Sequence, residues 1–354
     1  MKSRSGIVVL VIVAVCLILL LVTISDRRSR SLWPAERVEV DSGYREVMGT
    51  FARIVAVGAN ERIGREAVEV GLAQIRRINN LMSDYIADSE LSRVNRQAFA
   101  GPVKVSDDLF EVLSRAAVFS KQTDGAFDVT IGPMVDLYRK AKTEHKVLSE
   151  EEINQAKRRV GFEKLLLDGE GKTVQFAHDG MRLDLGGIAK GYAIDLAADT
   201  MIKKGVIGGM VDIGGDIRCF GAPPAGRKKW QIGLQDPDIS QSGKTDGNLV
   251  VVLEVINRAV ATSGDYRRFV LIDGKKYSHI VKPATGKGAS DFSSVTIICD
   301  NATDADAIAT AVSVMGQEKG LQYVESRDGT EAVLISAGPE FKRTFTTGAE
   351  EYIK

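Results

Sequence analysis

The amino-acid sequence predicts an α+β protein in which helices and strands are mixed without a regular β-α-β repeat. Some segments carry apolar residues three or four positions apart, which is typical of helices, and others alternate apolar and polar residues, which is typical of strands. Glycine-rich turns join several of the strand-like segments. This pattern favours mixed or antiparallel sheets with flanking helices over a doubly wound parallel sheet.

The first thirty residues differ from the rest of the chain. Residues 7–24 are apolar except for Thr23, and Lys2 and Arg4 precede them. At about 1.5 Å per residue, a helix of this length extends roughly 27 Å, just enough to span the core of a bilayer. Because the run is long for a signal peptide and no small-x-small cleavage site follows it, we expect an uncleaved N-terminal transmembrane helix within residues 1–25.

Two alternatives stay open for this segment, a cleaved signal peptide and lipoprotein processing at Cys16. The residue just ahead of Cys16 is Val15, where a lipidated cysteine usually follows a small residue. Residues 26–44 are polar and arginine-rich and are expected to form a linker, and residues 45–354 are expected to form the folded domain. The arginines after the apolar run oppose an orientation that places this domain outside the cytoplasm.

Caps and spacing place the expected helices along the chain. Residues 62–80 carry apolar side chains close to helical spacing, and Ser149 with Glu152 forms a capping box ahead of a further helix. Thr303 is the expected N-cap of the last helix. The expected helices cover residues 62–80, 88–95 and 107–123, a segment that starts at Ser149, and residues 191–203 and 304–314.

The expected strands lie between these helices. Residues 165–176 predict a hairpin, and residues 210–221 predict two strands around a paired-glycine bend. Further strands are expected at residues 48–57, 230–235, 249–256, 259–263, 268–272 and 293–299, and the chain returns to strands at its C-terminal end.

Charge and cysteine content narrow the function classes. Lys and Arg balance Asp and Glu at 47 each, and no basic run is interleaved with aromatic residues, so we expect no nucleic-acid partner. Cys219 and Cys299 lie in apolar, strand-like segments, where buried free thiols are expected; a disulfide between them is the alternative. The three histidines show no zinc-type spacing with the cysteines.

Three segments carry residue types suited to chemistry. In TDADAIATA, Asp306 and Thr310 are four positions apart, so a carboxylate and a hydroxyl project from one helix face and would suit a hard cation such as Mg²⁺. Acidic residues in a first helical turn also act as caps, which is the alternative. His279, in YSHIVKPATG, could take a proton from a hydroxyl or could be a structural histidine.

The third segment, LDLGGIAKGYAID, places paired glycines and one lysine between an apolar run and a helix. Glycines at such a turn usually allow a close backbone approach, often to a phosphate. The spacing fits neither G-x-G-x-x-G nor G-x-x-x-x-G-K-[ST], so this turn does not identify its ligand.

Eight segments follow one another in an order that resembles one family: MGTFARI, LMSDYIADSELSRVN, TDGAFDVTIGPMVDLY, DLGGIAKGYAID, VDIGGDI, ATSGDYRRF, YSHIVKPATG and ADAIATAV. They are similar to the motifs of the ApbE family, the FAD:protein FMN transferases, and extend from about residue 48 to residue 316. The resemblance implies a two-lobed ApbE-like fold. It also implies a Mg²⁺-dependent enzyme that transfers FMN from FAD to a threonine hydroxyl of a target protein through a phosphoester, releasing AMP.

The resemblance further implies partners and a location. The acceptor would be a subunit of a membrane redox complex, such as the sodium-translocating NADH:quinone reductase. The catalytic domain would lie on the extracytoplasmic side of the bacterial inner membrane, anchored by the N-terminal helix. Related proteins can hydrolyse FAD to FMN and AMP, so a pyrophosphatase is one alternative, and a non-catalytic flavin-binding protein is another.

Site residues follow from their positions in the matched motifs. His279 is the candidate base, since an imidazole titrates near neutral pH. The metal ligands would be the carbonyl of Gly187, the carboxylate of Asp306 and the hydroxyl of Thr310. One departure is Lys282, which stands where the family usually has Asp. The implied FAD contacts are Met48, Tyr85, Ala126, Phe127, Asp128, Asp184, Lys190 and Ile280.

Overall fold

The computed structural model describes residues 36–354 except residues 236–248, 265–268, 273–274, 279 and 339–340. The transmembrane helix expected within residues 1–25 therefore lies outside the described residues. Within the described ranges, no helix combines the length and the hydropathy that crossing a membrane requires. The chain from Val38 to Lys354 forms one compact unit.

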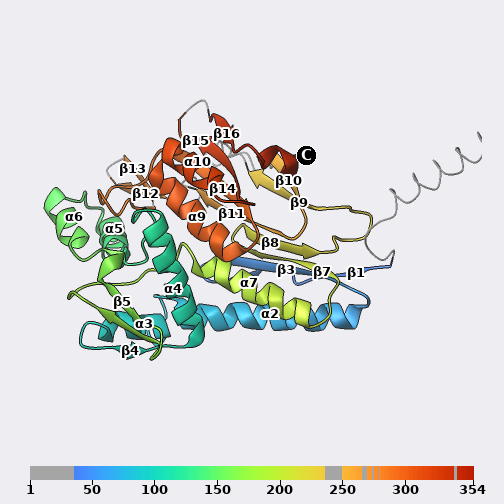
Figure 1. The fold of residues 1–354 in the computed structure, drawn as a ribbon, viewed down its shortest axis with the longest axis horizontal. Helices are drawn as coiled ribbons and strands as arrows, with labels where there is room; N and C mark the ends of the chain where they lie inside the picture. Colours follow the sequence, from blue (N-terminus) through green and yellow to red (C-terminus); the bar gives the residue numbers. More distant parts are fainter. Residues whose placement is uncertain (1–35, 236–248, 265–268, 273–274, 279, 339–340) are drawn as a thin grey trace, which may run out of the picture. The chain divides into compact units, whose positions relative to one another are not determined.

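A nine-stranded sheet forms the centre of this unit, and every strand pair described in it is antiparallel (Figure 1). The order is β1-β3-β7-β8-β11-β14-β15-β16, and β2 also pairs with β3. The strands are β1 (Val38–Asp41), β2 (Arg45–Val47), β3 (Thr50–Gly58), β7 (Gly208–Ile213), β8 (Asp216–Gly221), β11 (Arg258–Gly264), β14 (Phe292–Cys299), β15 (Glu331–Ser336) and β16 (Arg343–Phe345).

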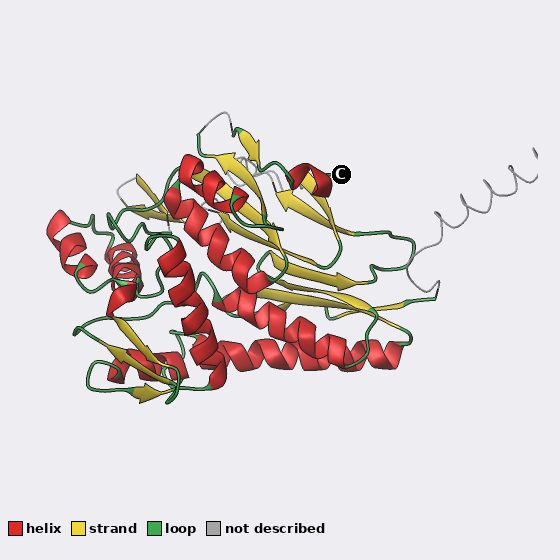
Figure 2. Ribbon diagram, in the orientation of Figure 1, coloured by secondary structure: helices red, strands yellow, loops and turns green. Residues whose placement is uncertain are grey.

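Three helices lie side by side against this sheet, as Figure 2 shows: α2 (Glu61–Met82), α7 (Ala189–Lys203) and α9 (Ala302–Met315). The sheet residues that join them in the main core recur every second position, as in Ile54 and Ala56 of β3. Most buried residues of α9 are small and apolar, so the helix packs closely against α7, β11 and β14. The three helices thus hold the chemistry-bearing segments against one sheet.

A smaller part of the unit contains the remaining helices and a three-stranded sheet in the order β4-β6-β5. It has its own small core around Met134, Tyr138 and Val160. The second lobe expected from the resemblance is therefore a region of one compact unit and not a separate one. Its elements are α3 (Glu90–Gln97), β4 (Val103–Lys104), α4 (Asp107–Gln122), α5 (Gly132–Glu144), α6 (Glu150–Lys157), β5 (Leu165–Asp168) and β6 (Thr173–Phe176).

Two short two-stranded sheets and one helix complete the described fold. One sheet pairs β9 (Trp230–Gln235) with β10 (Leu249–Val255), and the other pairs β12 (Phe269–Ile272) with β13 (Lys275–Ser278). Helix α10 (Gln317–Glu325) follows α9 directly, where the sequence predicted no helix.

Most expected elements are confirmed, and three differ in an instructive way. Strand β1 lies inside the stretch expected to be a linker, because Val38 to Asp41 pair with the far half of β3. Residues 132–144 form α5, where no helix was expected. The N-cap of α9 is Asn301 and not Thr303: Asn301 accepts a hydrogen bond from the Asp304 amide (2.9 Å), and Thr303 is already helical.

Cys219 and Cys299 are free and buried. They flank β11 on its two sides, with Cys219 opposite Arg258 and Cys299 opposite Ala259. Neighbouring residues of a strand point to opposite faces of a sheet, so the two thiols also point to opposite faces. The alternative of a disulfide between them is therefore wrong.

We predict that neither thiol reacts rapidly with Ellman's reagent in the folded protein at pH 8. Burial raises the pKa of Cys299 to about 12 and also raises the pKa of Cys219, so the reactive thiolate is scarce. A Cys16→Ser background removes the third cysteine, and unfolding in guanidinium should then release two titratable thiols without added reductant. Release of none would contradict the pairing geometry.

Candidate functional site

The candidate site lies at one end of the large sheet. The bend between β7 and β8 meets the start of β3, where the Gly214 amide donates to the carbonyl of Phe51 (2.9 Å). Asp216 opens β8 directly after this bend, and its Oδ1 accepts from the Thr262 amide near the end of β11 (3.0 Å). The strand register thus brings a buried carboxylate to the end of the central strands that α9 covers.

Helix α9 presents Asp306 and Thr310 on one face, as their spacing predicted. Asp306 is 3% exposed, and its Oδ2 accepts a hydrogen bond from the Gly191 amide (3.2 Å). The Thr310 hydroxyl lies 3.5 Å from the Ser263 hydroxyl of β11. The carboxylate and the hydroxyl therefore face the interior of the site, which disfavours the reading of Asp306 as a solvent-facing cap.

The paired-glycine turn meets this face of α9 directly. A side chain at position 187 would place its Cβ 2.8 Å from Thr310 Oγ1, closer than real Cβ atoms pack, and 3.3 Å from Phe127 Cε2, which is a tight contact. Glycine fits there without displacing the Thr310 side chain, which agrees with the close backbone approach inferred from the sequence. Residues 127, 187 and 310, far apart in the chain, are thus brought together.

Lys190 supplies the positive charge of the site. Its Nζ lies 2.6 Å from Asp216 Oδ2 and 2.9 Å from Asp306 Oδ1. Burial alone would lower the pKa of Lys190, but the two carboxylates outweigh burial and hold its pKa above the ordinary value. Burial raises the pKa of Asp306, and the Lys190 ammonium opposes that rise. The sequence implied that Lys190 contacts FAD; here it bridges two carboxylates, and Asp216 was not anticipated at all.

The donor set at Asp306, Thr310 and Gly187 fits a small hard cation. Mg²⁺ binds oxygen ligands, keeps several waters and commonly uses one or two carboxylates. Asp306 and Asp216 are both buried, and a single ammonium neutralises them, so the pocket is built to hold positive charge. In the described part of the chain, no group of three or more His, Cys, Asp or Glu side chains is arranged to bind a metal. A cation bound at Asp306 would therefore need hydroxyl and carbonyl oxygens as further ligands.

The expected FAD contacts at residues 126–128 lie beside this cation site. The Phe127 ring is buried and packs edge-on against Phe119 at 6.0 Å between ring centroids. Asp128 Oδ1 accepts from the Thr130 amide (2.8 Å) and hydroxyl (2.7 Å), and burial raises the pKa of Asp128. Ala126 is half-buried, and its amide donates to the Thr123 carbonyl (3.0 Å).

A second cluster surrounds Tyr85, whose side chain is 79% exposed. The Arg139 guanidinium lies over the Tyr85 ring, 4.6 Å from its centroid, and binds Asp84 (2.5 Å) and Asp184 (3.2 Å). Asp184 also accepts from the Gly186 amide (2.8 Å), and burial raises its pKa. An exposed aromatic ring backed by a fixed cation is a suitable surface for a flat ligand. The sequence did not predict Arg139, because α5 itself was not expected.

Met48 occupies a tight turn between β2 and β3, where a strand was expected to begin. Its φ is +53° and that of Gly49 is +67°, with Val47 paired to Thr50. Two positive φ values are typical of a type I′ hairpin turn, which methionine rarely opens. Backbone strain of this kind is concentrated at functional sites, so the turn marks Met48 as more than a core residue.

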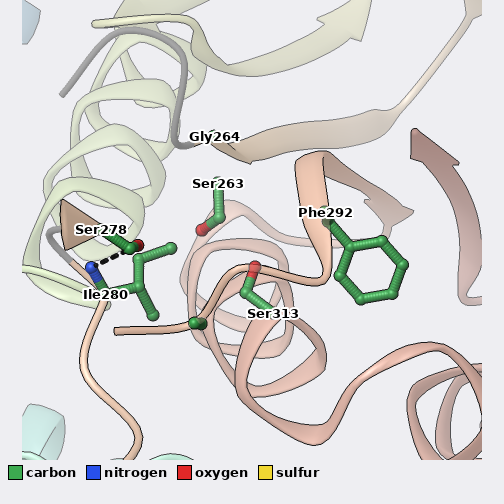
Figure 3. A pocket seen from close by; sticks show the side chains of 7 residues that line it. Ser263, Gly264, Ser278, Ile280, Phe292 and Ser313 are labelled. Carbon is green, nitrogen blue, oxygen red and sulfur yellow. Dashed lines mark hydrogen bonds between the residues drawn. The ribbon is translucent and has the colours of Figure 1, made fainter. Parts of the chain in front are cut away.

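Ile280 lines a small pocket with Ser263, Ser278, Phe292 and Ser313 (Figure 3). The hydroxyls of Ser263 and Ser313 point toward the same space, and Ser278 Oγ accepts from the Ile280 amide (3.1 Å). Ser313 lies one turn beyond Thr310 on α9, so the pocket continues from the cation site. His279, the expected base, lies outside the described residues.

Lys282, which departs from the family pattern, binds Asp291 through its Nζ (3.0 Å). The pair is partly exposed, so its contribution to stability is small. Its charge therefore balances the carboxylate of Asp291.

Comparison with known proteins shows the family of this chain. The model of the ApbE family matches residues 48–334. A Vibrio cholerae protein named FAD:protein FMN transferase is 31% identical over 325 residues, which cover 90% of this chain and 94% of that protein. A Treponema pallidum protein of the same name is 33% identical over 84% of this chain and 85% of its own.

Solved structures show the same fold. The crystal structure of the ApbE protein from Thermotoga maritima has a TM-score of 0.78 and 30% identity, over 90% of this chain and all of that one. The structure of the flavin transferase ApbE from Vibrio cholerae has a TM-score of 0.75 and 30% identity, with the same coverage.

We predict that Lys190→Met lowers the free energy of unfolding by about 3–5 kcal/mol in buffer with a chelator, because it leaves two buried carboxylates without a partner. Urea unfolding followed by circular dichroism measures the loss. Lys140→Met is the matched control, since Lys140 is 70% exposed and its ion pair with Glu144 is long (3.8 Å); its effect should stay within about 0.5 kcal/mol. Equal effects would show that the buried pairings are not needed for stability.

Proposed function

The chain belongs to the ApbE family, and from that premise we propose that it works as a Mg²⁺-dependent transferase that moves FMN from FAD to a threonine of an acceptor protein. Relatives that this chain covers over 94% and 85% of their length are named FAD:protein FMN transferases. The observation that carries the finer proposal is the meeting of Gly187 with Thr310 beside Asp306 and Phe127.

The reaction exchanges one phosphorus–oxygen bond for another at a single phosphorus atom. The threonine oxygen of the acceptor forms a bond to the phosphorus of the FMN half, and the bond from that phosphorus to the oxygen shared with AMP breaks. AMP leaves with the electron pair of the broken bond, and the hydroxyl proton passes to a base. One FAD and one threonine thus yield one phosphoester-linked FMN and one AMP.

This chemistry needs positive charge at a fixed position, because a diphosphate repels an incoming oxygen. Mg²⁺, when bound, neutralises phosphate charge and stabilises the charge that develops as the bonds exchange. Asp306, Thr310 and the Gly187 carbonyl would hold the ion. Lys190 stays tied to Asp216 at 2.6 Å and keeps a second positive charge at the same place.

The flavin end has a separate surface. The open face of Tyr85, backed by Arg139, suits the flat isoalloxazine ring. Asp184 connects the two ends, because it binds Arg139 and also fixes the Gly186 amide one residue before Gly187. Holding the ring and the diphosphate on one connected frame fixes the reacting phosphorus relative to the incoming hydroxyl.

The proposal includes a location outside the cytoplasm, anchored by residues 1–25. The apolar run of residues 7–24 supports an anchor, and a subunit of a membrane redox complex is the acceptor class that such an anchor suits. A reporter enzyme fused after Lys354 and active only in the cytoplasm would contradict this location.

We predict that full-length protein, FAD, Mg²⁺ and such an acceptor subunit yield covalent flavin on the acceptor, together with one AMP per flavin. In-gel fluorescence after denaturation measures the flavin, and chromatography measures AMP. A chelator should remove both products, and an acceptor with its target threonine changed to alanine should stay dark. AMP without covalent flavin would identify a hydrolase instead.

His279→Ala in the same assay tests the base. We expect transfer to fall by roughly 10²–10⁴-fold, the usual contribution of general base catalysis, while FAD binding is retained. Asp306→Ala should also abolish transfer, and added Mg²⁺ should not restore it. Transfer by His279→Ala at the rate of the parent protein would remove His279 from the mechanism.

A further inference from the structure

Asp195 ties together the three elements that carry the charged residues of the site. We propose that Asp195 is a positioning residue, which fixes α9 against α7 and β8 so that Asp306 and Thr310 face the Gly187 carbonyl at the distance a divalent cation requires. This inference rests on the proposed cation site and adds a residue that touches neither the ion nor FAD.

The Asp195 carboxylate accepts hydrogen bonds from the first two amides of α9, which are buried. Oδ1 accepts from the Ala302 amide (3.0 Å), and Oδ2 accepts from the Thr303 amide (2.8 Å) and the Thr303 hydroxyl (2.6 Å). The first amides of a helix have no partner within the helix, and a negative charge there is favourable. Asn301 caps the third amide, that of Asp304, from within the same segment. Only Asp195 makes this cap from another helix.

Gly191 makes the second contact between α7 and α9. It lies one helical turn before Asp195, on the same face of α7. A Cβ on Gly191 would lie 2.1 Å from the Ala302 carbonyl oxygen, so the two helices touch at their backbones. The Gly191 amide also donates to Asp306 (3.2 Å). Contacts at two successive turns of α7 fix both the distance to α9 and its rotation.

Arg218 connects the same carboxylate to the sheet. Its Nη1 lies 3.0 Å from Asp195 Oδ1 and 3.0 Å from Asp199 Oδ1. Arg218 belongs to β8, the strand that begins at Asp216. Helix α7, helix α9 and strand β8 therefore meet twice, first at Lys190 with Asp306 and Asp216, and again at Asp195. The second meeting includes none of the proposed cation ligands, so we assign it the task of holding the first one in register.

Residues that orient metal ligands without binding the metal typically change metal affinity 10- to 100-fold when they are replaced. Asp195→Asn keeps the size of the side chain but puts an amide donor opposite a backbone amide. The start of α9 would then lose its tie to α7, and Asp306 and Thr310 would shift relative to Gly187. Because many helices have such a cap, the measurement has to distinguish the loss of a helix cap from a shift of Asp306 and Thr310.

The test measures binding of Mn²⁺, a paramagnetic substitute for Mg²⁺ at oxygen ligands, to the full-length protein by electron paramagnetic resonance. We expect Asp195→Asn to weaken Mn²⁺ binding at least 10-fold. Asn301→Ala is the matched control, because it removes a cap from the same helix but no tie to α7; its Mn²⁺ affinity should stay within about 2-fold of the parent. Thermal unfolding of both variants establishes that each is folded at the temperature of measurement.

Thr303→Val provides a milder variant if Asp195→Asn does not fold. It removes one bond to Asp195 and keeps both amide bonds, so Mn²⁺ affinity should fall in the same direction by a smaller factor. Equal Mn²⁺ affinity in the parent, Asp195→Asn and Thr303→Val proteins would overturn the positioning role alone. Equal losses of Mn²⁺ affinity in Asp195→Asn and Asn301→Ala would show that Asp195 acts only as a helix cap. A parent protein that binds no Mn²⁺ would overturn both this inference and the proposed cation site.

Discussion

Two buried carboxylates that share one ammonium are the constraint on which the rest of this structure depends. Asp216 and Asp306 come from a strand and a helix far apart in the chain, and neither can stay ionised inside the protein without a nearby positive charge. Lys190 meets both and thereby fixes the start of α7 against β8 and α9. An arrangement of this kind adds little to stability over an apolar core, so stability alone does not account for it.

Small residues let the backbone come close to this charge. Gly187 leaves space for the Thr310 hydroxyl, and Gly191 lets two helices touch where Asp306 is bound. Along α9, Asp306, Thr310 and Ser313 then form one polar line, and it leads from the charged residues to the pocket beside Ile280. One helix thus serves both the cation and the space beyond it.

Local patterns were enough to predict much of the fold. Helices with clear caps were found, because Ser89, Ser106 and Ser149 each accept a hydrogen bond from an amide three residues later. The motif positions led to Gly187, Asp306 and Thr310, which the structure brings together. Three residues were not predicted, because each acts through partners that are distant in sequence: Asp216, Arg139 and Asp195. Met48 was misplaced because nothing in its side chain signals a left-handed backbone.

The stacking of Arg139 on Tyr85 places an exposed aromatic ring beside a fixed cation. The guanidinium lies over one face of the phenol ring, 4.6 Å from its centroid, and the Tyr85 side chain is 79% exposed. Because Asp84 and Asp184 both bind the guanidinium, the ring has a fixed support on that face. A planar ligand that stacked on the ring would therefore lie against the face that Arg139 leaves open.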